Sequence, residues 1–233
     1  MYLWVFQGNL GDGKTFGASV LAHYFQSKAR AAGVPVDLYS NYGLKGSKEL
    51  GNYKDFYNVA RSPNSIGIMD EAHVNLDSRL FSKGSNIYMT QFFFYFRKLH
   101  HTMFLTTPSI RNLDSRVRNL TNILVDCRKA GGSFIYNVYD YSGEKLLRRL
   151  YLPSMKVKQL FACKLYNTDN IVRNVQFPST EREFDKFLTE IINARNEFLS
   201  GKALKGRTDY LSQDETDERY VKMLTEGMEI EDE

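Results

Sequence analysis

The segment YLWVFQGNLGDGKT, residues 2–15, decides the fold of this chain. Tyr2–Gln7 is short and apolar, as expected for a buried strand. Gly8–Thr15 then fits the pattern G-x-x-x-x-G-K-[ST], and a helical pattern runs from Thr15 to about Ala32, before the stop signal Gly33-Val34-Pro35. A strand, a glycine-rich turn and a helix in this order predict a phosphate-binding loop.

The positions of this loop have separate physical roles. The glycines permit the tight wrap that points backbone N–H groups at phosphate, and the helix directs its positive end at the same oxygens. We expect Lys14 to contact the β and γ phosphates of ATP as a solvent-facing charge, and the Thr15 hydroxyl to bind Mg²⁺. The predicted nucleotide-binding residues are Gly8, Asn9, Leu10, Gly11, Asp12, Gly13, Lys14, Thr15 and Phe16.

Two adjacent acids further along the chain match this loop. Ile66–Met69 is an apolar strand, and Asp70 and Glu71 follow at its carboxyl end, where ligands bind in parallel sheets. Asp70 is predicted to hold Mg²⁺, and Glu71 to act as general base on the attacking water. The alternative is that both only supply favourable acids to the first turn of a helix. Together with the loop, the pair predicts ATP hydrolysis.

Hydrolysis also needs a cation on the transferring phosphoryl group, and a polar side chain beside the γ-phosphate could sense it. Thr106 and Thr107 end a predicted strand, and Thr107 is the candidate sensor, although threonine is common at strand ends. For the cation we expect an arginine finger, often supplied by a neighbouring subunit, but no spacing selects it and each arginine is individually a better candidate for a surface charge. The candidates are Arg79, Arg97, Arg116 and Arg118, with Arg111 nearby.

Alternating strands and helices over the first 110 residues predict an α/β P-loop NTPase fold with a mostly parallel central sheet and helices on both faces. Later segments predict antiparallel edge strands and a C-terminal amphipathic helix. The expected strands are Val36–Ser40, Ser65–Asp70, Thr102–Thr107, Asn122–Asp126, Phe134–Tyr139 and Lys145–Tyr151, and the expected helices are Asn86–His101 and Thr180–Leu199.

Three regions are predicted along the chain: a P-loop ATPase domain over 1–176, a helical appendage over 177–213, and an acidic, mobile tail over 214–233. The tail holds nine acids and two bases, which leaves 29 basic against 18 acidic side chains, a net charge of +11, in residues 1–213. A basic body attracts polyanions, and the tail either competes for that surface or is simply solvated.

The chain is long enough, and at 42% hydrophobic apolar enough, to bury a sizeable core. Within the aromatic segment Tyr88–Phe96, core packing is favoured over a subunit interface or a nucleic-acid stacking surface. Phe92–Phe96 is far shorter than the ~20 residues of a membrane span. No signal peptide or transmembrane helix is predicted. Cys127 and Cys163 are expected to be buried thiols in a reducing compartment.

Beyond the loop and the acids, a weaker ordered pattern resembles the FtsK–HerA class of P-loop motors. Within that class, the genome-packaging ATPases of tailless internal-membrane viruses and the zonular-occludens-toxin-like proteins of filamentous phages are most similar. A glutamine sensor is usual after the fourth strand of this class, whereas here Pro108 follows Thr107. The residues that carry the pattern are Ser40-Asn41, Asp70-Glu71-Ala72-His73, Arg79, Phe96-Arg97-Lys98, Thr106-Thr107, Leu113-Asp114, Arg116-Val117-Arg118 and Leu165-Tyr166-Asn167-Thr168.

The resemblance implies a homo-oligomeric ring, commonly a hexamer, that moves double-stranded DNA without sequence preference. The first hypothesis is therefore a motor that packages viral DNA into a capsid and docks on capsid or portal-vertex proteins. The alternative is a zonular-occludens-toxin-like morphogenesis or export ATPase, a group that usually carries a transmembrane helix. A small-molecule or nucleotide kinase would need an acceptor pocket and an arginine-rich lid, and Glu71 argues against a module that never hydrolyses nucleotide.

Overall fold

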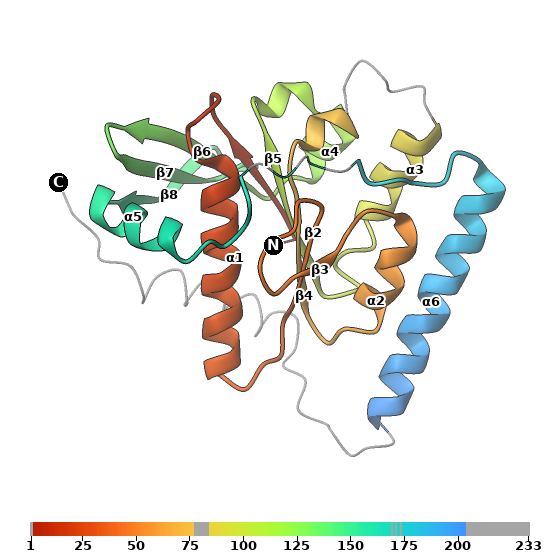
Figure 1. The fold of residues 1–233 in the computed structure, drawn as a ribbon. Helices are drawn as coiled ribbons and strands as arrows, with labels where there is room; N and C mark the ends of the chain where they lie inside the picture. The colour runs from red at the N-terminus through yellow and green to blue at the C-terminus, as the bar shows by residue number, and fades with distance from the viewer. Residues whose placement is uncertain (1, 77–83, 169, 171, 173, 204–233) are drawn as a thin grey trace.

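The structure, a computed structural model, describes residues 2–76, 84–168, 170, 172 and 174–203 (Figure 1). Its centre is one eight-stranded sheet with the strand order β3-β2-β4-β5-β1-β6-β7-β8. The strands are β1 Leu3–Gln7, β2 Asp37–Ser40, β3 Lys48–Glu49, β4 Ser65–Met69, β5 His101–Thr107, β6 Ile123–Ala130, β7 Ser133–Asp140 and β8 Lys145–Leu152. The helices are α1 Lys14–Ala31, α2 Phe56–Ala60, α3 Gly84–Phe93, α4 Ser115–Leu120, α5 Ser154–Ala162 and α6 Glu181–Ala203, with short 3₁₀ turns η1 Tyr53–Asp55, η2 Ala72–Val74 and η4 Ile110–Asn112.

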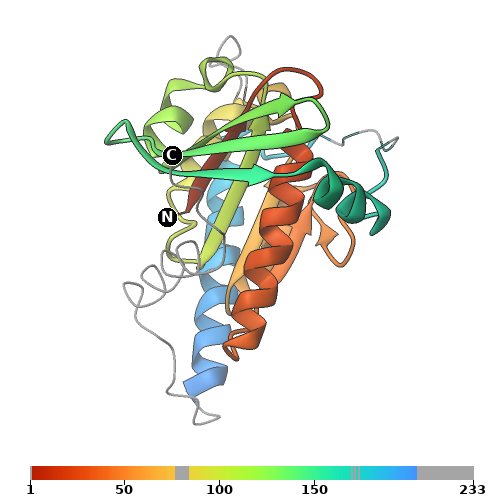
Figure 2. The same cartoon turned by 90° about the vertical axis from the view of Figure 1, so that its left-hand side faces the viewer.

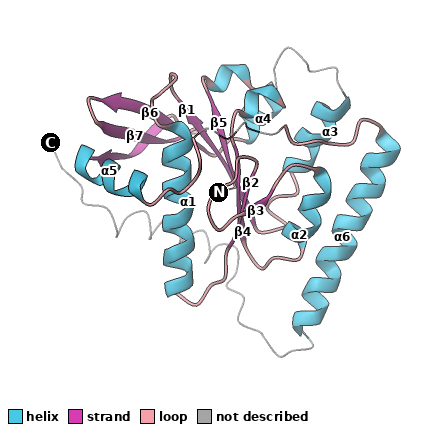
Figure 3. Cartoon of the chain, viewed as in Figure 1, coloured by secondary structure: helices cyan, strands magenta, loops and turns pink. Residues whose placement is uncertain are grey.

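The sheet is parallel from β3 to β6 and antiparallel from β6 to β8. The predicted fold class, a mostly parallel sheet with antiparallel edge strands and a C-terminal helix, is therefore confirmed (Figure 3). β5 lies between β1 and β4. The phosphate loop after β1, the end of β5 and the acids after β4 consequently meet at one edge of the sheet.

Each face of the sheet is covered by its own hydrophobic cluster. Because side chains alternate along a strand, Leu3 and Val5 of β1 belong to one cluster, and Trp4 and Phe6 belong to the other. α1 and α5 cover the Trp4 face, whereas α2, α3 and α6 cover the Val5 face (Figures 1 and 2). This sandwich fixes the start of α1, and with it the loop, against the sheet.

Helix α6, which the sequence analysis assigns to an appendage, packs into the same core as the sheet. Phe184, Phe187 and Ile191 are buried among the residues of the Val5 face. The buried Arg195 donates from Nη1 to the carbonyl oxygens of Ser62 (2.7 Å) and Ala60 (3.4 Å). Ala60 is the last residue of α2 and Ser62 follows it, so the guanidinium lies at the carboxyl end of this helix, where a cation is favourable. α6 thus shares its core with the sheet. The acidic tail lies outside the described residues.

Two expectations, one about a helix and one about a cysteine, are wrong, and one helix was missed. The helix predicted over Asn86–His101 ends at Phe93, and the chain reaches β5 through turns in which His100 takes a positive φ of 51°. α5 was not predicted at all. Cys163 is exposed, whereas Cys127 is buried as expected. Core packing of the aromatic segment is confirmed for Phe92, Phe93 and Phe96, while Phe94 is 60% exposed.

Within the described part of the chain, no helix combines the length and the apolar character that crossing a membrane requires.

Candidate active site

The phosphate loop is wedged against β6 and β7. Gly8 and Gly13 have φ of 154° and 79°, which glycine tolerates best. A Cβ on Gly8 would lie 2.5 Å from the carbonyl oxygen of Cys127, and a Cβ on Gly13 would lie 2.7 Å from the ring of Phe134. Only glycine fits at either position, so the neighbouring strands fix the path of the loop.

Lys14 is held by the loop itself. Its Nζ donates to the carbonyl oxygens of Gly8 (3.0 Å) and Asn9 (2.9 Å). The residue is only 7% exposed, so the expectation that it faces solvent is wrong. The loop folds back over the first turn of α1 and encloses the ammonium group. The charge lies where it can neutralise a phosphate bound inside the loop.

Asp12 braces the loop from outside. Its carboxylate accepts the Asn9 N–H at 2.7 Å and the Lys129 N–H of β6 at 3.2 Å. This side chain therefore ties the loop to the sheet and to its own start. Leu10, at the tip of the loop, is 97% exposed.

Asp70 is the centre of an oxygen cluster at the end of β4. Its Oδ1 accepts hydrogen bonds from Thr15 Oγ1 (2.7 Å) and Thr106 Oγ1 (2.5 Å), and the residue is 8% exposed. Mg²⁺ takes oxygen ligands and is often bound through one or two carboxylates together with substrate phosphates. The carboxylate of Asp70 and the hydroxyl of Thr15 fit that requirement, and these two would hold the ion.

Asn41, at the end of β2, frames Asp70 from the backbone side. Asn41 Oδ1 accepts the Asp70 N–H (2.8 Å), and Asn41 Nδ2 donates to the Asp70 carbonyl oxygen (3.1 Å). The amide thereby continues the pairing of β2 with β4 by one residue. One signal for this role is visible in the sequence, a polar residue directly after a strand, but that signal does not identify the partner.

Glu71 follows in a left-handed conformation, with φ 52° and ψ 43°. Its N–H donates to Thr106 Oγ1 (3.1 Å), so one hydroxyl connects the backbone of Glu71 to the carboxylate of Asp70. The Glu71 side chain is 39% exposed, and its Oε2 lies 3.4 Å from Nδ1 of His73. The carboxylate is therefore accessible to water beside the buried Asp70.

Thr107, the candidate sensor, faces away from the acids. Its Oγ1 donates to the carbonyl oxygen of Ser109 at 3.0 Å. Neighbouring side chains of a strand point to opposite faces, so Thr106 and not Thr107 reaches Asp70. The sequence placed both threonines at this strand end but did not give the face that each would take.

The candidate arginines are engaged elsewhere or exposed. Arg116 forms a two-pronged bond with Asp114 (2.9 and 2.8 Å), which holds the pKa of that carboxyl below its usual range. Arg118 donates to the carbonyl oxygen of Arg111, and Arg97 is exposed. Arg79 lies outside the described residues. None of the three described candidates, Arg97, Arg116 and Arg118, hydrogen-bonds to the loop, to Asp70 or to Glu71, so the finger stays a prediction.

A hollow of about 460 Å³ opens beside the loop, between the turn after β5 and the middle of β6. Asp12, Ser109 and Arg128 are among the residues that line it. Cys127 also borders the hollow, but burial, with Asp126 next to it, raises the pKa of this thiol. The thiol therefore stays neutral and acts as a packing group.

Tyr166, from the segment after α5, lies on the Asp70 side of α1. Its ring meets Tyr42 edge to face at 5.4 Å. Burial raises the pKa of Tyr166 to about 12, and the charge of Asp70 adds to the effect. This phenol is therefore neutral at physiological pH.

Two solved structures, among others, resemble this chain. The N-terminal domain of zonular occludens toxin from Neisseria meningitidis is 19% identical, covers 71% of this chain and 98% of its own, and superposes with a TM-score of 0.51. The genome packaging NTPase of Sulfolobus turreted icosahedral virus 2, in complex with ATP-gammaS, is 10% identical over 65% of this chain and 97% of its own, with a TM-score of 0.45. No curated protein matches the chain.

The family comparison is more direct. The model of the family described as zonular occludens toxin (Zot) matches residues 44–187, more than half of the chain. The matched region contains Asp70, Glu71 and Thr106, whereas the phosphate loop precedes it. The predicted resemblance to Zot-like P-loop proteins is thus confirmed, and the chain belongs to the zonular occludens toxin family.

Proposed function

We propose that this protein is an ATP-hydrolysing motor that moves DNA. The observation that carries the proposal is the oxygen cluster of Thr15, Asp70 and Thr106, with the accessible carboxylate of Glu71 beside it. A site that only binds nucleotide has no need of a carboxylate placed to accept a proton from water. Hydrolysis, in contrast, requires one.

Each side chain has a defined part in the proposed reaction. Lys14 and the N–H groups of the loop bind the phosphates. Thr15 and Asp70 would hold Mg²⁺, and the ion would supply positive charge next to the transferring phosphoryl group. Glu71 orients the attacking water and accepts its proton. Thr106 keeps Asp70 and the Glu71 backbone in fixed relation, because it bonds to both.

The first candidate for the work done is packaging of double-stranded viral DNA. The net charge of +11 over residues 1–213 supports an interaction with phosphate backbones. In this proposal the chain forms a homo-oligomeric ring, hexameric by analogy with the class, binds duplex without sequence preference, and docks on capsid or portal-vertex proteins in the host cytoplasm or virion.

The second candidate is an ATPase of phage morphogenesis or export. The observation that favours it is the family match over residues 44–187. In this proposal the nucleic acid is a single strand, and the work is done at a membrane. Both candidates use the same ATP site, so they differ in the nucleic acid that stimulates it.

The test measures ATP turnover of the purified protein without DNA, with duplex and with single strands, together with the oligomer mass in a non-hydrolysable ATP analogue. Lys14→Ala is the control, because it removes the charge enclosed by the loop. We expect stimulation that weakens steeply between ~50 and ~200 mM salt, since phosphate contacts release counterions.

Stimulation by duplex supports packaging, and stimulation by single strands alone supports export. Turnover that no DNA changes, from an oligomer that binds no DNA at low salt, would overturn the motor and leave an ATPase with another task. If the parent protein and Lys14→Ala hydrolyse ATP equally, the proposed site itself is wrong.

A further inference from the structure

The start of α1 carries an aromatic stack that the phosphate and metal chemistry does not use. The rings of Phe16 and Phe161 are parallel within 3°, with centroids 4.4 Å apart. On its other side Phe16 meets Phe134 of β7 at 5.6 Å. Phe134 in turn packs directly against Gly13 of the loop. A continuous aromatic wall, Phe134–Phe16–Phe161, therefore runs from the phosphate loop outward to α5.

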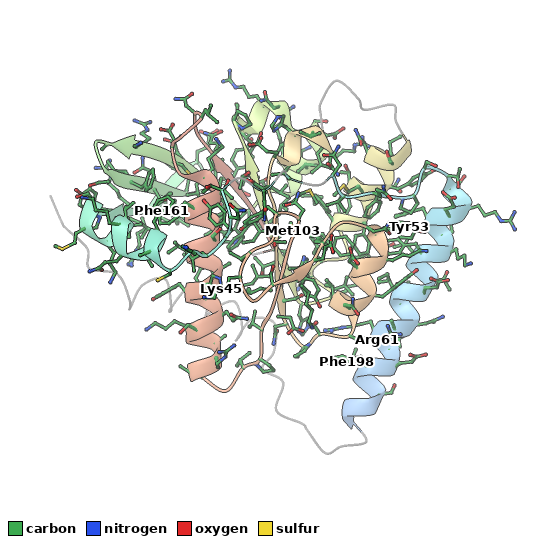
Figure 4. The ribbon with its side chains drawn as sticks, in the orientation of Figure 1. Lys45, Tyr53, Arg61, Met103, Phe161 and Phe198 are labelled. Carbon is green, nitrogen blue, oxygen red and sulfur yellow. The ribbon has the colours of Figure 1, made fainter. Side chains whose placement is uncertain are left out.

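This wall lies on the opposite side of the loop from the acids. Asp70 follows β4, which is separated from β1 by β5, whereas β7, which α5 contacts, lies beyond the other neighbour of β1, β6. Figures 1 and 2 both show α5 next to the N-terminal half of α1, and Phe161 is labelled there in Figure 4. A nucleotide whose terminal phosphate points to Asp70 and Glu71 thus directs its base toward α5.

The outermost ring of the wall is both rigid and open. Phe16 is 2% exposed and anchors one face of the Phe161 ring, yet Phe161 itself is 44% exposed. Val157, one turn earlier on α5, is buried in the core and fixes the helix. One face of Phe161 is consequently covered, and the other is presented to solvent beside the loop.

We propose that Phe161 is the platform on which the base of the bound nucleotide stacks while the loop holds its phosphates. The inference rests on the proposed ATPase function and extends it to the recognition of the base. Every base has a π face, so stacking on an aromatic ring tolerates different bases. A phenyl ring also offers no hydrogen bond to the base edge, and Phe161 therefore supports ATP and GTP alike.

The test compares ligands with and without a base. Calorimetry measures the affinity of Mg²⁺ complexes of ATP, GTP and inorganic tripolyphosphate for the parent protein, Phe161→Ala and Phe161→Leu. Leucine keeps apolar cover over Phe16 without an aromatic face. Met155→Ala, at a 71% exposed position of the same helix, is the matched control. A second readout is Phe161→Trp, because the one native tryptophan, Trp4, is buried on the α1 face of the sheet.

Loss of the platform should weaken ATP and GTP on the order of 5- to 150-fold in Phe161→Ala, and less in Phe161→Leu, as expected for one stacked base. Tripolyphosphate should bind both variants and the parent equally, and Met155→Ala should bind every ligand like the parent. In Phe161→Trp, the fluorescence of the introduced indole should be quenched by ATP and GTP but not by tripolyphosphate.

Two results would overturn the platform and leave the ATPase standing: equal binding of ATP and tripolyphosphate by the parent, or losses in Phe161→Ala that are equal for both ligands. ATP affinity that is unchanged in both Phe161→Ala and Phe161→Leu would do the same. If the parent binds neither ATP nor tripolyphosphate, the phosphate site fails first, and the base platform fails with it.

Discussion

The acid cluster and the arginine-rich turn lie after neighbouring strands, β4 and β5, yet their side chains are held in opposite ways. Asp70 receives two hydroxyl groups from other elements and is framed by Asn41. Arg116, in contrast, is paired with Asp114 only two residues away. One folded chain therefore assembles the phosphate and metal parts of the site, but its described candidate arginines do not reach them. The finger therefore stays a prediction, with Arg79, outside the described residues, and an arginine of a second copy as its two sources.

The largest effect is expected from substitution of the candidate finger arginines. Arg97, Arg116, Arg118 and the undescribed Arg79 are changed singly to alanine. At least one variant should lose turnover by about 10³–10⁵-fold with little loss of ATP affinity, the size of an arginine finger in related phosphoryl-transfer systems.

Mixing separates a finger in trans from one in cis. When the inactive arginine variant is mixed with Lys14→Ala, mixed oligomers contain sites with an intact loop facing an intact arginine. Turnover should then recover in part. If the mixture stays as inactive as its components, the finger does not come from a neighbouring copy.

A smaller effect on turnover is expected from Thr106, which bonds to the acid pair. Thr106→Val keeps the shape of the side chain but removes the bonds to Asp70 and to the Glu71 N–H. Turnover should fall about 10- to 100-fold, since hydrogen bonds to charged groups are worth about 1.5–3 kcal/mol. The same change at Thr107, whose hydroxyl bonds only to the Ser109 carbonyl, should cost less. A larger loss from Thr107→Val than from Thr106→Val would support Thr107 as the phosphate sensor.

The smallest effect concerns Arg116 as a structural cation. Its side chain is 37% exposed, so solvent screening limits its contribution, and Arg116→Ala should cost at most about 1 kcal/mol of unfolding free energy at pH 7. The pair lowers the pKa of Asp114, so its stabilisation is present above the unfolded value of 3.8 and is lost as pH falls through the folded pKa. Urea unfolding of parent and variant should therefore converge in that acidic range. A difference that persists there would show that Arg116 acts through packing instead.

The features that could be predicted are those that depend on short, continuous segments of the sequence. The loop pattern identifies Gly8–Thr15 from the sequence alone. An apolar strand followed by Asp70-Glu71 likewise predicts that these acids lie at the carboxyl end of the sheet. The start of the fold, strand–loop–helix, follows from the same short segment. These features need no knowledge of distant partners.

The missed features all depend on contacts between distant segments. Asn41 was not assigned because its partner lies 29 residues away, and the burial of Lys14 follows from how the loop closes over it. Thr106 and Thr107 differ only in the strand face they take. Phe161 belongs to a helix that was not predicted, and its ring stacks on Phe16, which is 145 residues earlier in the sequence. The periodicity of apolar residues within one segment does not predict contacts between segments that are distant in the sequence.

Glu71→Gln shows whether the loop and the acid pair form one hydrolytic ATP site. ATP binding and phosphate release are measured with Mg²⁺ in the parent, in Glu71→Gln and in Glu197→Gln, a control on the exposed side of α6. The account predicts parental ATP affinity in all three, and turnover that falls by about 10²–10⁴-fold in Glu71→Gln alone, because the amide cannot accept the proton of the attacking water. Hydrolysis by Glu71→Gln at the parental rate would contradict it.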